Sequence, residues 1–104
     1  MNIVSMFSKE CERLFVHDDM RAAMAAIGTY KHFAWTSDDQ PSDEKMLEVL
    51  SATDILLTGW GSPRLPLCLL DQPHRRLRYI CNMPGTLQHP IPRKYLESGI
   101  VITN

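Results

Sequence analysis

The sequence predicts an α/β fold in which five parallel strands alternate with helices. Three observations predict it: short apolar runs recur along the chain, segments with helical spacing or an opening proline lie between them, and glycine, proline or polar residues mark most boundaries. The chain has 104 residues, of which 44% are hydrophobic and 22% are charged. This length and composition are typical of a single globular domain.

The predicted strands are rich in apolar, β-branched or aromatic residues, as expected of strands that are covered on both faces. They span residues 2–7, 30–35, 55–58, 77–81 and 100–103.

The segments between these strands are predicted to be helical. One helix is expected over residues 18–27, ended by Gly28, and a second over residues 42–51, capped by Ser42. Pro66 and Pro92 are each expected to open a short helix, because proline suits the first helical position. The first of these carries the leucines of residues 67–70, and the second runs through Leu96 and is closed by Gly99. Residues 10–15 are ambiguous.

Strands that alternate with helices through short connections form a parallel sheet with helices on both faces, and five of them suggest a flavodoxin-like unit. In such open sheets, ligands bind outside the carboxyl ends of the strands, so residues 59–63 and 82–86 are the expected ligand-binding loops. The final helix of such a unit is lacking, because no helix follows the last strand. We therefore expect apolar surface near residues 100–102 to be exposed or covered by another chain.

Charge and cysteine content exclude several classes of function. The formal net charge of -1 and the pI near 6.4 give no electrostatic reason to bind nucleic acid or an acidic membrane surface. The apolar run at residues 3–7 is too short to span a membrane or to serve as a signal peptide, which predicts a cytoplasmic protein. Cys11, Cys68 and Cys81 are odd in number and widely spaced, so we expect reduced thiols rather than disulfides or a zinc site.

The segment from Thr53 to Asn104 carries a set of marks in a particular order. They are Asp54 before an apolar strand, the turn Thr58-Gly59-Trp60-Gly61 after it, Leu77 before the fourth strand, Gly85 in the following loop, and Gly99-Ile100-Val101-Ile102-Thr103-Asn104 at the end. In this order and spacing the segment resembles the D-isomer-specific 2-hydroxyacid dehydrogenases, the family of phosphoglycerate dehydrogenase. The resemblance covers about half of the chain.

The resemblance implies the leading part of a flavodoxin-like substrate-binding domain. In the family this domain is followed by an NAD-binding Rossmann domain and a returning C-terminal helix, and main-chain N–H groups of the loop after the fourth strand bind the carboxylate of a 2-keto or 2-hydroxy acid. The candidate substrate-binding residues are Trp60, Gly61, Asn82, Met83, Gly85 and Thr86. Pro84 departs from the family pattern because it has no N–H to donate.

The family's catalytic arginine, glutamate and histidine lie in a later part of the chain, and no position here matches them. The dinucleotide motif G-x-G-x-x-G does not occur either. This short chain is therefore expected to be inactive alone and to bind NAD weakly or not at all, with no metal site. A small 2-keto or 2-hydroxy acid is the expected ligand, and a second copy of the chain or the missing dehydrogenase domain is the expected partner.

A stand-alone interaction or regulatory module is the alternative. Such a module keeps the fold, loses the chemistry and dimerises or docks through the uncovered edge near residues 100–102. A phosphoacceptor is disfavoured because it needs an aspartate at the end of the third strand, where the chain has Thr58. FMN binding is disfavoured because residues 8–11 supply no phosphate-binding loop.

Several single residues have two interpretations. Trp60 can wall a ligand pocket or pack against a neighbouring element, and the two are weighed equally. His89 is interpreted as a surface residue rather than a catalytic one. The basic cluster lies opposite the expected ligand-binding edge, so it is interpreted as a solvated rim rather than a phosphate site. Its members are His74, Arg75, Arg76 and Arg78.

Overall fold

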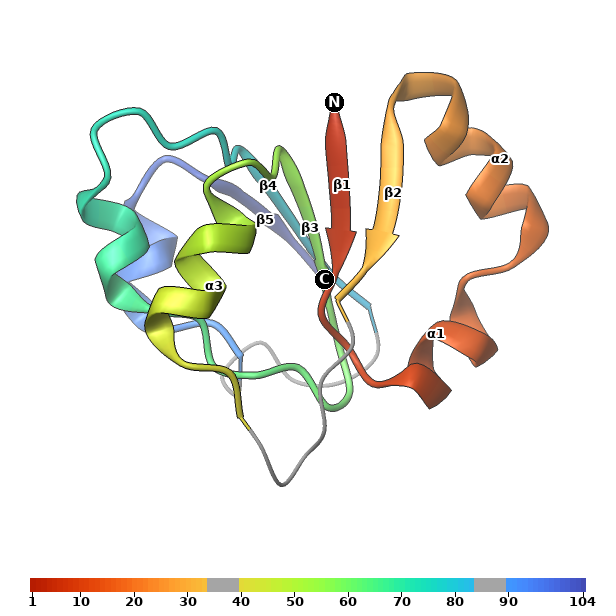
Figure 1. The fold of residues 1–104 in the computed structure, drawn as a ribbon, viewed down its shortest axis with the longest axis horizontal. Helices are drawn as coiled ribbons and strands as arrows, with labels where there is room; N and C mark the ends of the chain where they lie inside the picture. Colours follow the sequence, from red (N-terminus) through yellow and green to blue (C-terminus); the bar gives the residue numbers. More distant parts are fainter. Residues whose placement is uncertain (34–39, 84–89) are drawn as a thin grey trace.

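The computed structural model describes residues 1–33, 40–83 and 90–104. A sheet of five parallel strands runs through the middle of the molecule in the order β2-β1-β3-β4-β5 (Figure 1). The strands are β1 (Asn2–Ser5), β2 (Thr29–His32), β3 (Ile55–Thr58), β4 (Tyr79–Asn82) and β5 (Val101–Thr103). This is the strand order of flavodoxin-like folds, so the predicted fold class is confirmed.

Helices cover both faces of the sheet, as predicted. Helices α1 (Lys9–Phe15) and α2 (Asp18–Ile27) lie on one face, and α3 (Asp43–Leu50) lies on the other (Figure 1). Two short 3-10 helices, η1 (Leu67–Asp71) and η2 (Arg93–Glu97), share the α3 face. The ambiguous residues 10–15 therefore belong to a helix, which begins where the Ser8 side chain accepts a hydrogen bond from the Cys11 N–H at 3.1 Å.

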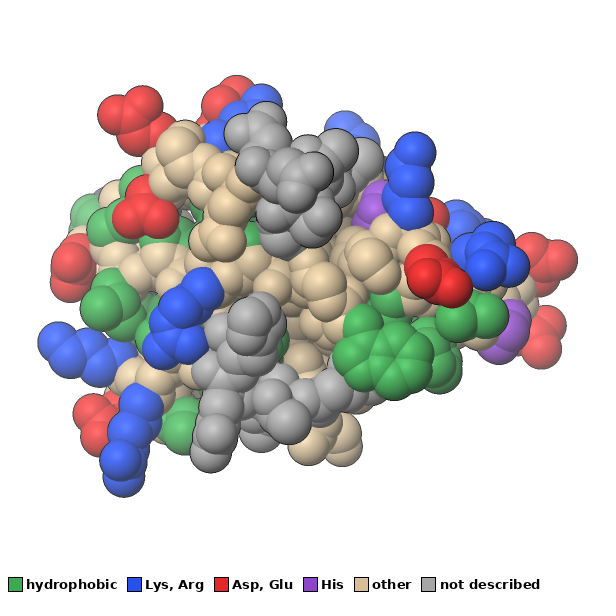
Figure 2. All heavy atoms as spheres, turned by 90° about the horizontal axis from the view of Figure 1, so that it is seen from below, with side chains coloured by type: hydrophobic (Ala, Val, Ile, Leu, Met, Phe, Trp, Pro, Cys, Tyr) green, Lys and Arg blue, Asp and Glu red, His purple; other side chains and the backbone are tan. Residues whose placement is uncertain are grey.

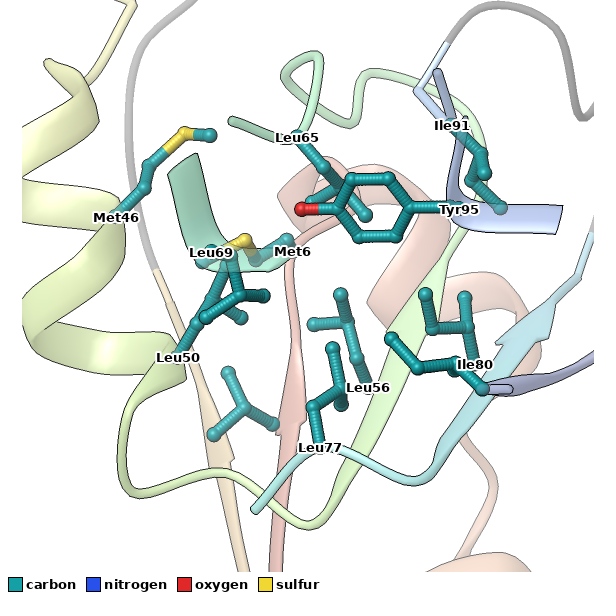
Figure 3. Packing of buried hydrophobic residues seen from close by; sticks show 12 residues of the cluster. Met6, Met46, Leu50, Leu56, Leu65, Leu69, Leu77, Ile80, Ile91 and Tyr95 are labelled. Carbon is teal, nitrogen blue, oxygen red and sulfur yellow. The ribbon is translucent and has the colours of Figure 1, made fainter. Parts of the chain in front are cut away.

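The larger part of the hydrophobic core lies between the sheet and the α3 face. Met46 and Leu50 of α3 pack there with Leu56 of β3 and Leu69 of η1 (Figure 3). Tyr95 of η2 is fully buried in the same cluster, and its hydroxyl donates a hydrogen bond to the Pro66 carbonyl. Burial of this phenol raises its pKa. The smaller cluster lies on the α1 and α2 face.

Element boundaries differ from the prediction where burial extends beyond strand pairing. Met6 and Phe7 follow β1 and are fully buried, but they pack into the clusters on opposite faces of the sheet rather than extending the strand. Leu77 is likewise buried before β4 begins, so this strand starts and ends later than predicted. The apolar runs predicted these buried residues correctly, but they extend beyond the segments that pair as strands. Trp35, expected in the second strand, lies outside the described residues.

The two proline-initiated segments form short helices, as predicted, and both are 3-10 helices. Leu67 and Leu96 are 49% and 61% exposed, so neither segment buries a complete stripe. The second segment ends at Glu97, one residue after the predicted Leu96 and ahead of Gly99. A short segment gains few helical hydrogen bonds, which makes the tighter 3-10 turn a common outcome at this length.

One part of the sheet has no helix over it among the residues that the structure describes. Tyr79 of β4 and Val101 of β5 are paired in register and are 46% and 51% exposed. Exposed apolar surface was predicted over residues 100–102, but Ile100 is buried and Ile102 is half-buried. The exposed apolar surface therefore consists of Val101 together with Tyr79 of β4. We call Tyr79, Val101 and their half-buried neighbour Cys81 the open face.

Candidate functional site

The loops that follow neighbouring strands meet at the carboxyl edge of the sheet. The Ser8 N–H after β1 donates to the Trp60 carbonyl after β3 at 2.8 Å, and the Met83 N–H after β4 donates to the Thr58 carbonyl at 2.8 Å. These main-chain hydrogen bonds fix the exits of three adjacent strands relative to one another. They lie at the edge where parallel α/β sheets usually bind ligands.

A chain of side-chain hydrogen bonds links the ends of β3, β4 and β5. Thr58 and Asn82 are both buried and paired in register, and the Thr58 hydroxyl donates to Oδ1 of Asn82 at 2.8 Å. The Asn82 amide in turn donates to Oδ1 of Asn104 at 3.2 Å. Asn82 thus bonds to partners inside the protein and links the ends of the three strands.

The turn after β3 is held by Ser62, whose hydroxyl accepts a hydrogen bond from the Gly59 N–H at 2.9 Å. The Ser62 N–H returns a bond to the Gly59 carbonyl at 3.1 Å. Gly61 has a φ of 78°, and a Cβ at this position would lie 2.8 Å from the Ser8 Cβ. A glycine is required here both for the backbone conformation and for the close approach of the loop after β1.

The two main-chain donors of this turn differ in their partners. The Trp60 main chain hydrogen-bonds to the Cys11 thiol and so lowers its pKa against the effect of burial. The Gly61 N–H has no hydrogen-bond acceptor among the described residues. The turn thus offers one main-chain donor at the edge where a ligand is expected.

The Trp60 side chain both packs and remains accessible. Its indole meets the Phe15 ring of α1 edge-on, with the ring centroids 5.4 Å apart, and it is 51% exposed. Leu14 of α1 is also exposed, and hydrophobic side chains gather on the α1 side of this edge in Figure 2. Both interpretations of Trp60 therefore apply in part: it packs on α1 and presents an apolar surface beside the turn.

The structure brings four of the six predicted site residues to one edge, namely Trp60, Gly61, Asn82 and Met83. Asn82 is the last residue of β4 rather than part of the loop. Gly85 and Thr86, together with Pro84 and His89, lie outside the described residues.

A second polar cluster at the ends of β1 and β2 was not found from the sequence. The buried Ser5 hydroxyl lies 2.7 Å from Nδ1 of His32 and 2.8 Å from the Tyr30 hydroxyl. Tyr30 donates to Oε2 of Glu12 at 2.7 Å, and the Arg21 guanidinium lies over the Tyr30 ring. Ser5, a polar residue within an apolar strand, was the available signal, but the strand register that brings His32 beside it was not readable.

This cluster does not form a nucleophilic triad. A triad needs the hydroxyl and the carboxylate on different nitrogens of the histidine, whereas Ser5 and Glu12 both approach Nδ1, at 2.7 and 3.6 Å. Ser5 is also fully buried. Burial lowers the pKa of His32 although Glu12 acts in the opposite direction, and burial together with the Glu12 hydrogen bond raises the pKa of Tyr30 to about 12. The cluster is a hydrogen-bond network that joins β1, β2 and α1.

Other chemistry is limited in the described part of the chain. Burial raises the pKa of the Cys11 thiol, which makes it a poor nucleophile. The three cysteines are free, as expected. No group of His, Cys, Asp or Glu side chains suited to a metal ion occurs among residues 1–33, 40–83 and 90–104, and none of the helices described there is long and apolar enough to cross a membrane.

Asp54, one of the marks of the dehydrogenase resemblance, has a structural contact. Its carboxylate accepts hydrogen bonds from the Asn2 N–H at 2.6 Å and from the Arg76 guanidinium at 3.2 Å. The Asn2 hydrogen bond lowers the pKa of Asp54, with Arg76 acting in the same direction. Asp54 thus joins the starts of β1, β3 and β4.

In comparisons with known proteins, no family model matches this chain and no curated protein matches it.

Proposed function

We propose that this chain is the leading part of the substrate-binding domain of an NAD-dependent D-2-hydroxyacid dehydrogenase. In this proposal the carboxyl edge of β3 and β4 holds the carboxylate of a small 2-keto or 2-hydroxy acid, and a longer polypeptide supplies NAD and the catalytic groups. The observation that carries the proposal is the Gly61 N–H, which has no acceptor among the described residues and lies at the same edge as the start of the loop at Met83.

The described residues divide into positioning and contacting roles. Asn82 is buried and bonded to Thr58 and Asn104, so we assign it to positioning the edge rather than to contacting the substrate. Trp60 and Gly61 are exposed at the turn, and the N–H group of Gly61 suits a carboxylate oxygen. The Trp60 indole gives an apolar wall to one side. Gly85 and Thr86 stay predicted carboxylate contacts on the basis of the resemblance.

The open face supports the proposal that a further segment packs on this unit. Parallel strands are normally covered on both faces, and Tyr79 and Val101 expose apolar surface over β4 and β5. A returning C-terminal helix, as the resemblance implies, is the kind of element that would cover it. Asn104 lies beside Asn82 at the carboxyl edge, so polypeptide continuing from it would start next to the proposed site.

The first test is the mass of the natural protein, detected in its source cells with an antibody to this segment. Two domains of about 150 residues each imply roughly 35 kDa, compared with 11.9 kDa for residues 1–104. The protein is then purified and assayed for NAD reduction with matched D- and L-2-hydroxy acids. We expect turnover of a D-acid only. A large protein without activity on any 2-hydroxy acid would contradict the proposal.

The carboxylate site itself is tested by Gly85→Val in the natural protein, with Ala25→Val at an exposed position of α2 as the matched control. A branched side chain in the proposed anion loop should abolish binding of a 2-keto acid such as pyruvate, measured by calorimetry, while the circular dichroism spectrum stays unchanged. Equal affinity of the two variants would contradict the placement of the carboxylate.

A stand-alone interaction module is the second candidate, and the open face is the observation that favours it. A natural protein of 11.9 kDa that forms a stable oligomer and binds no 2-keto acid would support this candidate and would exclude the dehydrogenase.

A further inference from the structure

A polar pocket lies at the opposite end of the sheet from the proposed substrate site. It has a volume of about 420 Å³ and lies between the connection into β4 and the connection into β5. Its charged lining residues are Arg75 and Arg78, and its neutral polar ones include Gln72 and Ser98. These connections lie at the amino ends of the strands (Figure 1), so the pocket is separate from the edge at Trp60 and Gly61.

Arg75 is held in the pocket by two main-chain carbonyls. Its Nη1 donates to the Leu70 carbonyl at 3.1 Å and its Nη2 donates to the Ser98 carbonyl at 2.7 Å. These carbonyls belong to the ends of η1 and η2. Both partners are neutral, so the guanidinium keeps its full charge, and it has five N–H donors in all. The side chain is thus preorganised and still able to bind an anion.

The positive charge of the pocket has no carboxylate partner among the described residues. Arg76 is paired with Asp54 at 3.2 Å, but no described Asp or Glu lies within 4.0 Å of a guanidinium nitrogen of Arg75 or Arg78. Arg78 is exposed and lines the same pocket. The basic cluster is therefore not a uniform solvated rim: Arg75 and Arg76 have specific contacts, and Arg75 and Arg78, which have no acidic partner among the described residues, line one cavity.

We propose that this pocket binds a phosphate group, either as inorganic phosphate or as a small phosphate monoester. Guanidinium groups bind oxyanions through paired N–H donors, and a phosphate has enough oxygens to engage both Arg75 and Arg78. The volume falls within the range of small-molecule sites and leaves room for more than the phosphate itself. Tyr79 also lines the pocket.

Binding would connect the two segments that lead into β4 and β5. Arg78 directly precedes β4, and Arg75 is bonded to Ser98 ahead of β5. An anion shared by the two guanidinium groups would tie these segments together and stabilise the edge strand β5. The site does not depend on the dehydrogenase proposal, since it uses none of the residues at the carboxyl edge of the sheet.

The test is calorimetric titration of the natural protein with inorganic phosphate and with phenyl phosphate, at constant ionic strength. We expect saturable binding that weakens about tenfold or more in Arg78→Gln, a loss of one charged contact. Arg93→Gln is the matched control, because Arg93 is an exposed arginine of η2 outside the pocket. The Arg78 side chain has no hydrogen bond or ion pair to another described residue, and its main-chain hydrogen bonds to Asp54 and Val101 do not require the guanidinium, so its replacement should leave the fold intact.

The two ligands separate the sources of the phosphate group. Tighter binding of phenyl phosphate would support a phosphate monoester, and equal binding would support phosphate itself. Absence of saturation with both ligands would overturn the proposal. Equal weakening in the Arg78 and Arg93 variants would overturn it as well, because it would indicate unspecific attraction to surface charge. Tighter binding of succinate than of either phosphate would overturn the ligand class.

Discussion

Thr58 and Asn82 end neighbouring strands at the same register position, and the Thr58 hydroxyl donates a hydrogen bond to Oδ1 of Asn82 at 2.8 Å. Both side chains are buried. Burying a polar group without a hydrogen-bond partner lowers stability, so the pair favours the arrangement in which β3 and β4 end side by side. The relative position of the loops that follow these strands therefore depends in part on this buried hydrogen bond.

The pair is tested by replacing Asn82 with leucine, which has a similar size and no hydrogen-bonding group. Asn82→Leu leaves the buried Thr58 hydroxyl without its acceptor and should lower the free energy of unfolding by about 1–3 kcal/mol. Thr58→Val should cost less, because Asn82 keeps its bond to Asn104 and a further interaction. Both values are measured by urea denaturation.

The double variant Thr58→Val with Asn82→Leu removes donor and acceptor together. It should be less destabilised than the sum of the single variants, with a coupling of about 0.5–3 kcal/mol. Strict additivity would show that the hydrogen bond does not link the two strand ends.

Gly61 and Gly99 separate two reasons for a glycine. Both have a positive φ, of 78° and 88°, but only at Gly61 would a Cβ meet a neighbour, the Ser8 Cβ at 2.8 Å. Gly99→Ala should lower the free energy of unfolding by about 1–2 kcal/mol, the cost of a left-handed alanine. Gly61→Ala should lose at least about 1 kcal/mol more, because the loops after β1 and β3 must separate.

The same denaturation measurement gives both values. If the two variants lost equal stability, the contact between Gly61 and Ser8 would be without energetic importance.

His32 should make stability depend on pH. Burial lowers its pKa in the folded state below the 6.5 of an unperturbed histidine, opposed by Glu12 and assisted by Lys9 and Arg21. Between these two pKa values the unfolded chain binds more protons than the folded one, so stability rises with pH. The contribution is complete above pH 6.5 and is lost as the pH falls towards the folded-state pKa.

The measurement is the free energy of unfolding at several pH values between about 5 and 8. His32→Asn keeps a polar side chain near Ser5 but does not titrate, so the pH dependence should decrease in this variant. His74→Asn, at an exposed position, should leave it unchanged. Equal pH profiles for the two variants would assign the effect to other groups.

Much of the fold could be predicted because strand and helix signals are local. The run Ile55–Thr58 was predicted with its observed bounds, and Ser42 caps α3 as expected through a hydrogen bond from the Lys45 N–H. The predicted strand boundaries were wrong where a residue is buried without pairing to a neighbouring strand, as at Leu77, which precedes β4. Burial depends on packing between distant segments, which apolar character alone does not describe.

The candidate site was predictable only at the level of loops. Parallel topology placed the turn at Trp60 and the loop after Asn82 at one edge, as the rule for open sheets requires. The role of each residue depended on register, which no local pattern contains. Asn82 was expected in a loop and is a buried strand residue, and the pairing of Ser5 with His32 was not found.

The effect of a charged substitution on the open face should differ between residues 1–104 alone and a longer natural protein. Residues 1–104 alone expose Tyr79 and Val101 and should self-associate, because apolar surface over parallel strands is unfavourable in water. Val101→Lys should make this chain more monomeric, measured by sedimentation equilibrium, whereas Leu96→Lys, at a more exposed leucine of η2, should not. In a longer natural protein that covers the open face, the same Val101→Lys change should instead lower stability, because it would bury a charge. A monomeric 1–104 chain that is indifferent to Val101→Lys would show that this face needs no cover.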